Sequence, residues 1–234
     1  MYEKMKVRQV MKNTDGIRLL ILDFDGTLAD TMYGIMDGVN MAMDKFGMPR
    51  HTYDEIVSYV GNGSRDLIRR SLPEKYADNK ELLDEVVKYY DSSCYPVTYK
   101  NRTECYAGML DTLELLKKRG YTLAVLSNKR DIFIQPMVKE MLPEGLLSIA
   151  MGQTDLPKKP DPTAPLTIAK QLGFEPFETA FIGDSDTDML TGRNAKMLAV
   201  GCSWGYRPRE VLAEAGADVI IDAPTELADI FSEF

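Results

Sequence analysis

The stretch from Leu19 to Thr27 constrains the fold more than any other part of the sequence. An apolar run over residues 19–22 ends in Asp23-Phe24-Asp25-Gly26-Thr27. An apolar run that stops at a turn signal predicts a strand that is buried on both faces. Buried strands of this kind belong to parallel sheets that carry helices on both sides. Ligands of such sheets bind beyond the carboxyl ends of the strands, so we expect Asp23 and Asp25 to lie in a functional site.

The two aspartates are spaced so that they can act together. Side chains two positions apart on an extended chain point to the same side, which lets Asp23 and Asp25 converge on one small volume. Two negative charges at that distance are costly unless a proton or a metal ion relieves them. The alternative is that the segment only opens a polar loop, because Asp and Gly both favour turns.

Composition narrows the class of protein. The 234 residues suggest one large domain or two small ones, and the net charge of −8 argues against nucleic acid or an anionic membrane as a partner. The three cysteines form no Cys-x-x-Cys pair, which argues against a disulfide framework or a zinc knuckle. We find no apolar run near the ~20 residues of a membrane span and no secretory signal, so we expect a soluble, cytoplasmic protein.

The predicted secondary structure changes near residue 100, from helices alone to strands that alternate with helices. Apolar residues at helical spacing predict helices over 31–46, 53–60, 64–72 and 79–93, and no buried strand is expected between 31 and 99. Strands are predicted at 121–126, 146–151, 179–182, 198–200 and 219–221. Helices are predicted between them, at 109–119, 132–141, 162–172, 188–194 and 209–215. Strands that alternate with helices indicate a parallel, doubly wound sheet.

The first strand belongs with the later strands, so the helical segment is an insertion. We therefore expect an α/β protein with a Rossmann-like parallel sheet core, formed by residues 17–30 and 100–234. An all-helical cap of residues 31–99 would be inserted over the strand ends. Residues 1–16 form an N-terminal extension to which the sequence assigns no role.

Polar residues follow four of the predicted strands or the loops beside them. They are Asp23 and Asp25; Ser127 and Asn128; Lys158 and Lys159; and Asp184 with Asp188. Carboxylates suit Mg²⁺, which keeps coordination positions open for phosphate oxygens. A lysine supplies positive charge to a phosphate, and an aspartate can attack phosphorus as a covalent nucleophile. Together these groups predict a site for a cation and a phosphate.

In this order, the motifs resemble those of the haloacid dehalogenase superfamily of phosphohydrolases. The similarity is closest to the phosphoglycolate phosphatase-like branch, which has a helical cap. The matching segments are Asp23-Phe24-Asp25-Gly26-Thr27-Leu28, Ser127-Asn128-Lys129, Lys159-Pro160-Asp161-Pro162, and Gly183-Asp184-Ser185 with Asp188. The similarity to the branch rests on the lysine segment and on Val60-Gly61-Asn62-Gly63 with Arg70.

The resemblance implies roles for the acidic residues. Asp23 would attack the phosphate and become an aspartyl phosphate, while Asp25 would protonate the leaving alcohol and later deprotonate water. Magnesium would be held by the Asp23 carboxylate, the Asp25 backbone carbonyl and Asp184. Asp188 would orient these ligands from behind, without being one of them.

The resemblance also implies the phosphate and substrate contacts. Ser127 and Lys159 would hold phosphoryl oxygens, with the family pattern selecting the lysine that precedes proline. Thr27 and Asn128 are further candidate substrate contacts.

The cap would contribute the turn Gly61-Asn62-Gly63, which would contact the leaving group and select for it. Arg70 would either meet a substrate carboxylate or hold the cap together.

The implied activity is magnesium-dependent hydrolysis of a small phosphomonoester such as phosphoglycolate. The partner would be a small phosphorylated metabolite, and the protein a monomer or homodimer. Alternatives with the same fold are a phosphosugar mutase similar to β-phosphoglucomutase, a nucleotidase and a pyrophosphatase. A more distant alternative is a non-catalytic protein that binds a phosphorylated ligand. A dehalogenase is disfavoured because it needs neither Asp25 nor the acidic loop at Asp184.

Overall fold

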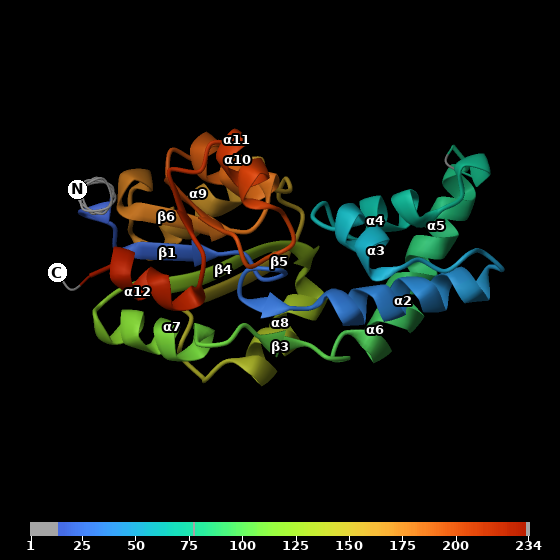
Figure 1. Cartoon of the computed structure of the whole chain (residues 1–234), viewed down its shortest axis with the longest axis horizontal. Coiled ribbons are helices and arrows are strands. Elements are labelled where there is room, and N and C mark those ends of the chain that lie inside the picture. The colour runs from blue at the N-terminus through green and yellow to red at the C-terminus, as the bar shows by residue number, and fades with distance from the viewer. Residues whose placement is uncertain (1–13, 77, 233–234) are drawn as a thin grey trace.

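The computed structural model of the chain describes residues 14–76 and 78–232. Most of the expected N-terminal extension, residues 1–13, therefore lies outside the described residues. The molecule has two lobes that lie side by side, one built around a sheet and one built of helices (Figure 1). Both described chain ends lie on the sheet lobe, at the end away from the helical lobe.

The sheet has six parallel strands in the order β5-β4-β1-β6-β7-β8. Their bounds are β1 Leu19–Leu22, β4 Thr122–Arg130, β5 Ile149–Gln153, β6 Thr179–Gly183, β7 Leu198–Cys202 and β8 Val219–Ile221. The predicted opening strand lies at the centre, paired with β4 on one side and β6 on the other. This arrangement confirms the predicted α/β core with a parallel sheet.

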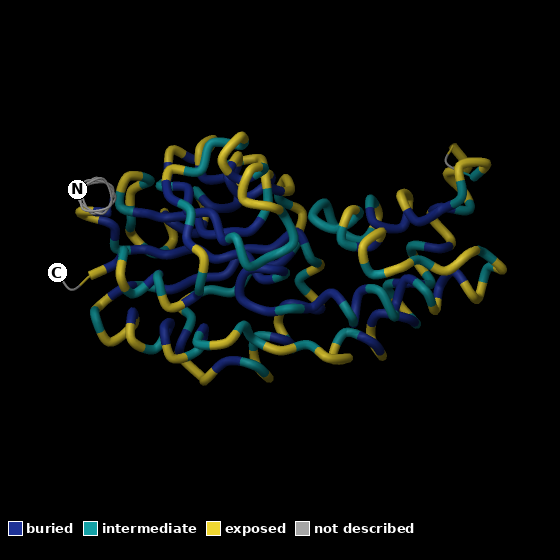
Figure 2. Tube along the Cα trace, viewed as in Figure 1, coloured by how far each residue is buried: buried dark blue, intermediate teal, exposed yellow. Residues whose placement is uncertain are grey.

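Helices cover both faces of the sheet, as the continuous apolar run of β1 requires (Figure 1). One face carries α7 (Met109–Lys118), α8 (Asp131–Met141) and α12 (Leu227–Ile230). The other carries α9 (Thr163–Leu172), α10 (Asp186–Asn194) and α11 (Arg209–Glu214). Leu20 and Leu22 pack into the first layer, whereas Leu19 and Ile21 pack into the second. The strands form the buried centre of this lobe (Figure 2).

The helical lobe, called the cap below, lies beyond the carboxyl ends of the strands (Figure 1). It contains α2 (Met32–Lys45), α3 (Tyr53–Tyr59), α4 (Ser64–Ser71), α5 (Lys80–Tyr89) and α6 (Tyr95–Thr98). A 3₁₀ turn spans Glu74–Tyr76, and a π-helical turn, Tyr90–Cys94, joins α5 to α6. The cap has its own apolar cluster, which includes Val39 and Ile68, and Phe133 of α8 joins it from the core.

The two chain crossings between core and cap pair with each other. β2 (Ala29–Asp30) leads into the cap and runs antiparallel to β3 (Glu104–Cys105), which leads back. Two residues are too few to show a strand pattern, so the sequence did not predict this pair. The same applies to the 3₁₀ turns Pro176–Glu178 and Pro224–Glu226 and to α12. Within the described residues, no helix combines the length and the apolar character needed to cross a bilayer.

The expected helix boundaries hold to within a few residues, with one correction. The predicted helix over 79–93 ends as an α-helix at Tyr89, where the π-helical turn begins. The helix α4 begins at Ser64 itself, and the residue before it, Gly63, takes the cap position with φ of 81°. A positive φ is readily adopted only by glycine, which explains the glycine at this turn.

The packing of α2 on α6 generates a stability prediction. A Cβ atom at Gly34 would lie 2.7 Å from the carbonyl oxygen of Thr98 and 3.0 Å from that of Tyr99. Alanine favours a helix interior over glycine by about 1 kcal/mol, but crowding in a packed contact costs about 1–3 kcal/mol. We expect Gly34→Ala to lower the free energy of unfolding, measured by denaturant titration.

The matched control is Met41→Ala on the same helix, whose side chain is exposed. We expect it to change the free energy of unfolding by no more than about 0.5 kcal/mol. A Gly34→Ala protein as stable as the wild type would contradict the close approach of α2 and α6.

Candidate active site

Three aspartates meet at the carboxyl edge of the sheet. Asp23 follows β1, Asp184 follows β6, and Asp188 lies in the first turn of α10. All three are buried, and one carboxylate oxygen from each lies within 4.8 Å of those of the other two. This is the kind of oxygen-rich cluster in which a divalent cation binds.

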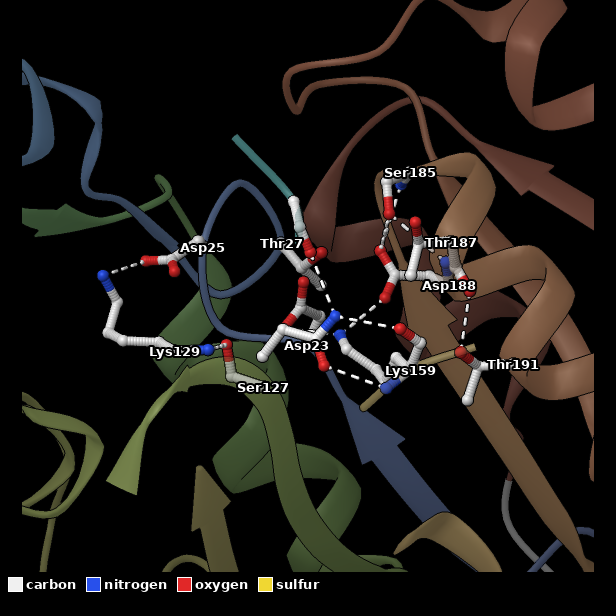
Figure 3. Close-up of polar contacts among 12 residues, drawn as sticks. Asp23, Asp25, Thr27, Ser127, Lys129, Lys159, Ser185, Thr187, Asp188 and Thr191 are labelled. Carbon is white, nitrogen blue, oxygen red and sulfur yellow. Dashed lines mark hydrogen bonds and ion pairs between the residues drawn. The ribbon is translucent and has the colours of Figure 1, made fainter. Parts of the chain in front are cut away.

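A single buried lysine lies among these carboxylates. Lys159 Nζ is 2.9 Å from Asp23 Oδ1 and donates to Asp188 Oδ1 at 2.7 Å (Figure 3). Only 3% of the Lys159 side chain is exposed. One ammonium therefore contacts two of the three buried carboxylates.

Burial and mutual repulsion raise the pKa values of the acids in this cluster. Burial, together with the charges of Asp188 and Asp25, raises the pKa of Asp23 to about 7, although Lys159 acts against the shift. Burial and the two neighbouring aspartates also raise the pKa of Asp184 well above its usual range. For Lys159, burial alone would lower the pKa, but Asp188 and Asp23 outweigh it and raise the pKa. The cluster carries more negative charge than one lysine can offset.

The neighbouring backbone and side chains hold Asp184 in place. Its Oδ1 accepts a hydrogen bond from the Thr27 hydroxyl at 3.0 Å, and its Oδ2 accepts one from the Tyr206 amide at 2.7 Å. Gly26 has a φ of 82°, and a Cβ at that position would clash with the Asp184 carboxylate. Thr27 is fully buried and its hydroxyl orients Asp184, while the substrate contact expected for it stays a prediction.

Asp188 is fixed by a capping box at the start of α10. The Ser185 side chain accepts a hydrogen bond from the Asp188 amide, and Asp188 Oδ2 accepts from the Ser185 amide at 3.1 Å and from its hydroxyl at 2.6 Å. Ser185 followed three residues later by an acid is a helix-start signal. It explains why α10 begins two residues before the predicted start. Both oxygens of Asp188 accept hydrogen bonds from the protein, since Oδ1 accepts from Lys159.

The carboxylate of Asp25 lies apart from the other three. Its Oδ1 accepts a hydrogen bond from the Thr31 hydroxyl at 2.5 Å and lies 3.1 Å from Lys129 Nζ. In Figure 3, Asp25 and Lys129 lie on the opposite side of Asp23 from Lys159. The cluster of three carboxylates does not include Asp25, so its expected metal contact, through the backbone carbonyl, stays a prediction.

The end of β4 brings Ser127 and Asn128 to the same edge. Ser127 is buried, and its Oγ accepts a hydrogen bond from the Lys129 amide. The Asn128 side chain accepts from the Lys159 amide at 2.9 Å and donates to the Lys159 carbonyl at 3.1 Å. Its amide nitrogen also donates to the Gly61 carbonyl of the cap at 3.1 Å. Asn128 therefore links the lysine segment to the cap.

A small cavity of about 70 Å³ lies between the core and the cap. On the core side it is lined by Asp23, Asp25, Ser127, Asn128, Lys129 and Asp184, and on the cap side by Ile35, Gly61, Gly63, Leu67, Tyr90 and Tyr95. The structure thus places the expected nucleophile, acid and serine around one cavity.

Two expected cap contacts lie elsewhere. Asn62 and Arg70 line a neighbouring hollow, and neither lines the cavity that holds Asp23. Arg70 Nε lies 2.8 Å from Asp66 Oδ2, and its guanidinium also donates to the Ser58 carbonyl at 3.2 Å. Of the two roles expected for Arg70, these contacts favour the one that holds the cap together.

Core donors that the sequence analysis did not assign fasten the cap. Arg207 donates to the carbonyls of Val57 at 2.7 Å and Val60 at 2.6 Å, and Lys158 donates to the Asn62 carbonyl at 3.2 Å. Arg207 follows the end of β7 by a few residues. The rule that pointed to the other strand ends applies equally to this segment.

The chain matches a family model described as haloacid dehalogenase-like hydrolase over residues 20–202. The phosphoglycolate phosphatase of Psychrobacter arcticus is 34% identical over 220 residues, covering 92% of this chain and 93% of the relative. The phosphoglycolate phosphatase of Haemophilus influenzae is 31% identical, covering 91% and 97%. A crystal structure of a hydrolase from Pseudomonas syringae superimposes with a TM-score of 0.74 at 26% identity, covering 91% and 96%.

The chain belongs to the haloacid dehalogenase-like hydrolases. The family match spans residues 23–28, the lysine segment and the acidic loop. These findings confirm the predicted fold class and the predicted enzyme class, a phosphoric monoester hydrolase.

The raised pKa of Asp23 predicts how stability depends on pH without metal. The carboxyl titrates near 3.8 when unfolded and at about 7 when folded. Between these values the folded state binds the extra proton, so the free energy of unfolding falls as pH rises from about 4 to 7 and levels off above. We expect chelator-treated protein to lose stability across this range, measured by denaturant unfolding, and Asp23→Asn to lose less. Parallel curves for the two proteins would contradict this electrostatic account.

Proposed function

We propose that the protein is a magnesium-dependent phosphatase that hydrolyses a small, phosphoglycolate-like phosphomonoester through an aspartyl phosphate. The observation that carries this proposal is the buried cluster of Asp23, Asp184 and Asp188 around Lys159, which opens on the cavity beneath the cap. The relatives named phosphoglycolate phosphatases support the substrate class. The predicted cytoplasmic location and monomeric or homodimeric state stay predictions.

The residues of the cluster fit a magnesium ion. They offer hard oxygen donors, and their raised pKa values reflect a negative charge that a divalent cation would relieve. Asp23, Asp184 and the Asp25 backbone carbonyl would hold the ion, while Asp188 would steady them because both its oxygens already accept hydrogen bonds. When bound, the ion would offset the charge of the phosphate.

The first step transfers the phosphoryl group to the protein. An Asp23 oxygen forms a bond to phosphorus as the bond from phosphorus to the leaving oxygen breaks. Lys159 and Ser127 hold the phosphoryl oxygens and stabilise their charge in the transition state. Asp25 gives its proton to the leaving oxygen, which departs as an alcohol.

The second step returns the enzyme to its starting state. Asp25, now ionised, takes a proton from a water molecule as that water attacks the phosphorus of the aspartyl phosphate. The bond between Asp23 and phosphorus breaks, and inorganic phosphate leaves. The cap covers the cavity and limits the access of other water molecules during attack.

We expect Asp23→Asn to abolish phosphate release from phosphoglycolate, with kcat lower by at least about 10³-fold, because the amide cannot attack phosphorus. Chelator treatment of the wild type should remove activity and added Mg²⁺ should restore it. The matched control is Asp186→Asn, since this aspartate begins α10 two residues before Asp188 but is exposed and outside the cluster. Colorimetric phosphate assays with a panel of small esters check each outcome.

Two outcomes would contradict the proposal. One is activity of the wild type that survives EDTA, or activity that persists in Asp23→Asn. The other is isomerisation of β-glucose 1-phosphate without release of phosphate, which would identify a mutase.

A further inference from the structure

Lys129 is a buried cation that the phosphoryl chemistry above does not use. It lies at the end of β4, lines the cavity, and has a side chain that is only 7% exposed. Its ammonium lies 3.1 Å from Asp25 Oδ1, donates to the Tyr95 hydroxyl, and sits 4.5 Å from the centre of the Tyr95 ring. Lys159 serves the phosphoryl side of Asp23, and Lys129 lies on the other side (Figure 3).

The ammonium of Lys129 has an unused donor. A lysine ammonium carries three N–H groups, and the described residues supply two partners, Asp25 and Tyr95. Burying a charged donor without a partner is costly. Asp25 is less dependent on this pair, because the Thr31 hydroxyl also donates to it. A ligand acceptor in the cavity would complete the hydrogen bonding of Lys129.

The other cations along the cavity are already committed. Arg130 is paired with Asp91 at 2.8 Å, and its side chain is 44% exposed. Arg207 donates to two carbonyls of the cap. Because Arg130 and Asp91 offset each other, Lys129 and Arg207 remain against the single acid Asp25 among the lining residues outside the carboxylate cluster. The charge in this part of the cavity therefore favours an anionic group on the ligand.

We propose that Lys129 is the specificity-determining residue for the leaving group, and that its ammonium binds a carboxylate on the alcohol half of the substrate. The preferred substrates are then small phosphate esters whose leaving alcohol carries a carboxylate. The inference rests on the proposed phosphatase function and specifies its substrate class.

The test compares two esters of nearly equal size. Phosphoglycolate carries a carboxylate where ethyl phosphate carries a methyl group, so the ratio of their kcat/KM values measures recognition of that carboxylate alone. We expect Lys129→Met to lower this ratio by about 30-fold, because a buried charge-assisted hydrogen bond is lost. Lys129→Gln, which keeps a polar group, serves as a second variant if the methionine protein folds poorly.

Arg130→Met is the matched control, because its charge is already paired with Asp91. We expect it to leave the ratio within about three-fold of the wild type, a margin below the loss of one charge-assisted hydrogen bond. A binding measurement without turnover adds a second readout. Calorimetry in the Asp23→Asn background should show that Lys129→Met weakens phosphoglycolate far more than ethyl phosphate.

Three outcomes would overturn the inference. An equal loss on both esters would mean that Lys129 only supports Asp25, and the phosphatase proposal would stand. If Arg130→Met instead lowered the ratio of kcat/KM values, Arg130 and not Lys129 would be the residue that binds the substrate carboxylate. A wild-type protein that hydrolyses no ester at all would remove the proposed function and this inference with it.

Discussion

Three buried carboxylates lie within 4.8 Å of one another at the carboxyl edge of the sheet, with one buried ammonium among them. Charges packed in this way cost folding free energy unless well-placed partners compensate them. The surroundings provide those partners: the Thr27 hydroxyl and the Tyr206 amide for Asp184, and Ser185 for Asp188. The repulsion that remains is the property that attracts a cation, so the arrangement that weakens the fold also equips it for phosphate chemistry.

The cap completes this site from outside the sheet. Because the insertion leaves after β1 and returns before β4, its paired linkers emerge beside the reacting groups. Core side chains then hold the cap turn by donating to its backbone carbonyls. Asn128 donates to the Gly61 carbonyl, and the same side chain bonds to the amide and the carbonyl of Lys159. The position of the lysine and the position of the cap are therefore connected by one side chain. The core carries the carboxylate cluster, and the boundary between core and cap determines the cavity beside it.

The sequence predicts the parallel sheet and the clustered strand-end acids, because both depend on local patterns. The apolar run before Asp23 defines a buried strand, and parallel strands bring their ends together without knowledge of any side-chain contact. The rest depends on contacts between residues distant in sequence. Examples are the ion pair between Asp25 and Lys129 and the hydrogen bond from Thr27 to Asp184. Another is the position of Arg70 away from the cavity. No pattern within a short segment encodes which of several nearby partners a side chain selects.

The central claim is that Asp23 becomes covalently phosphorylated. The most direct measurement is to quench the enzyme during turnover of phosphoglycolate, reduce it with borohydride, and map its peptides by mass spectrometry. An aspartyl phosphate is reduced to homoserine, so the account predicts homoserine at position 23 only when substrate and Mg²⁺ were present. Steady phosphate release with unmodified Asp23, or with the modification on another aspartate, would contradict it.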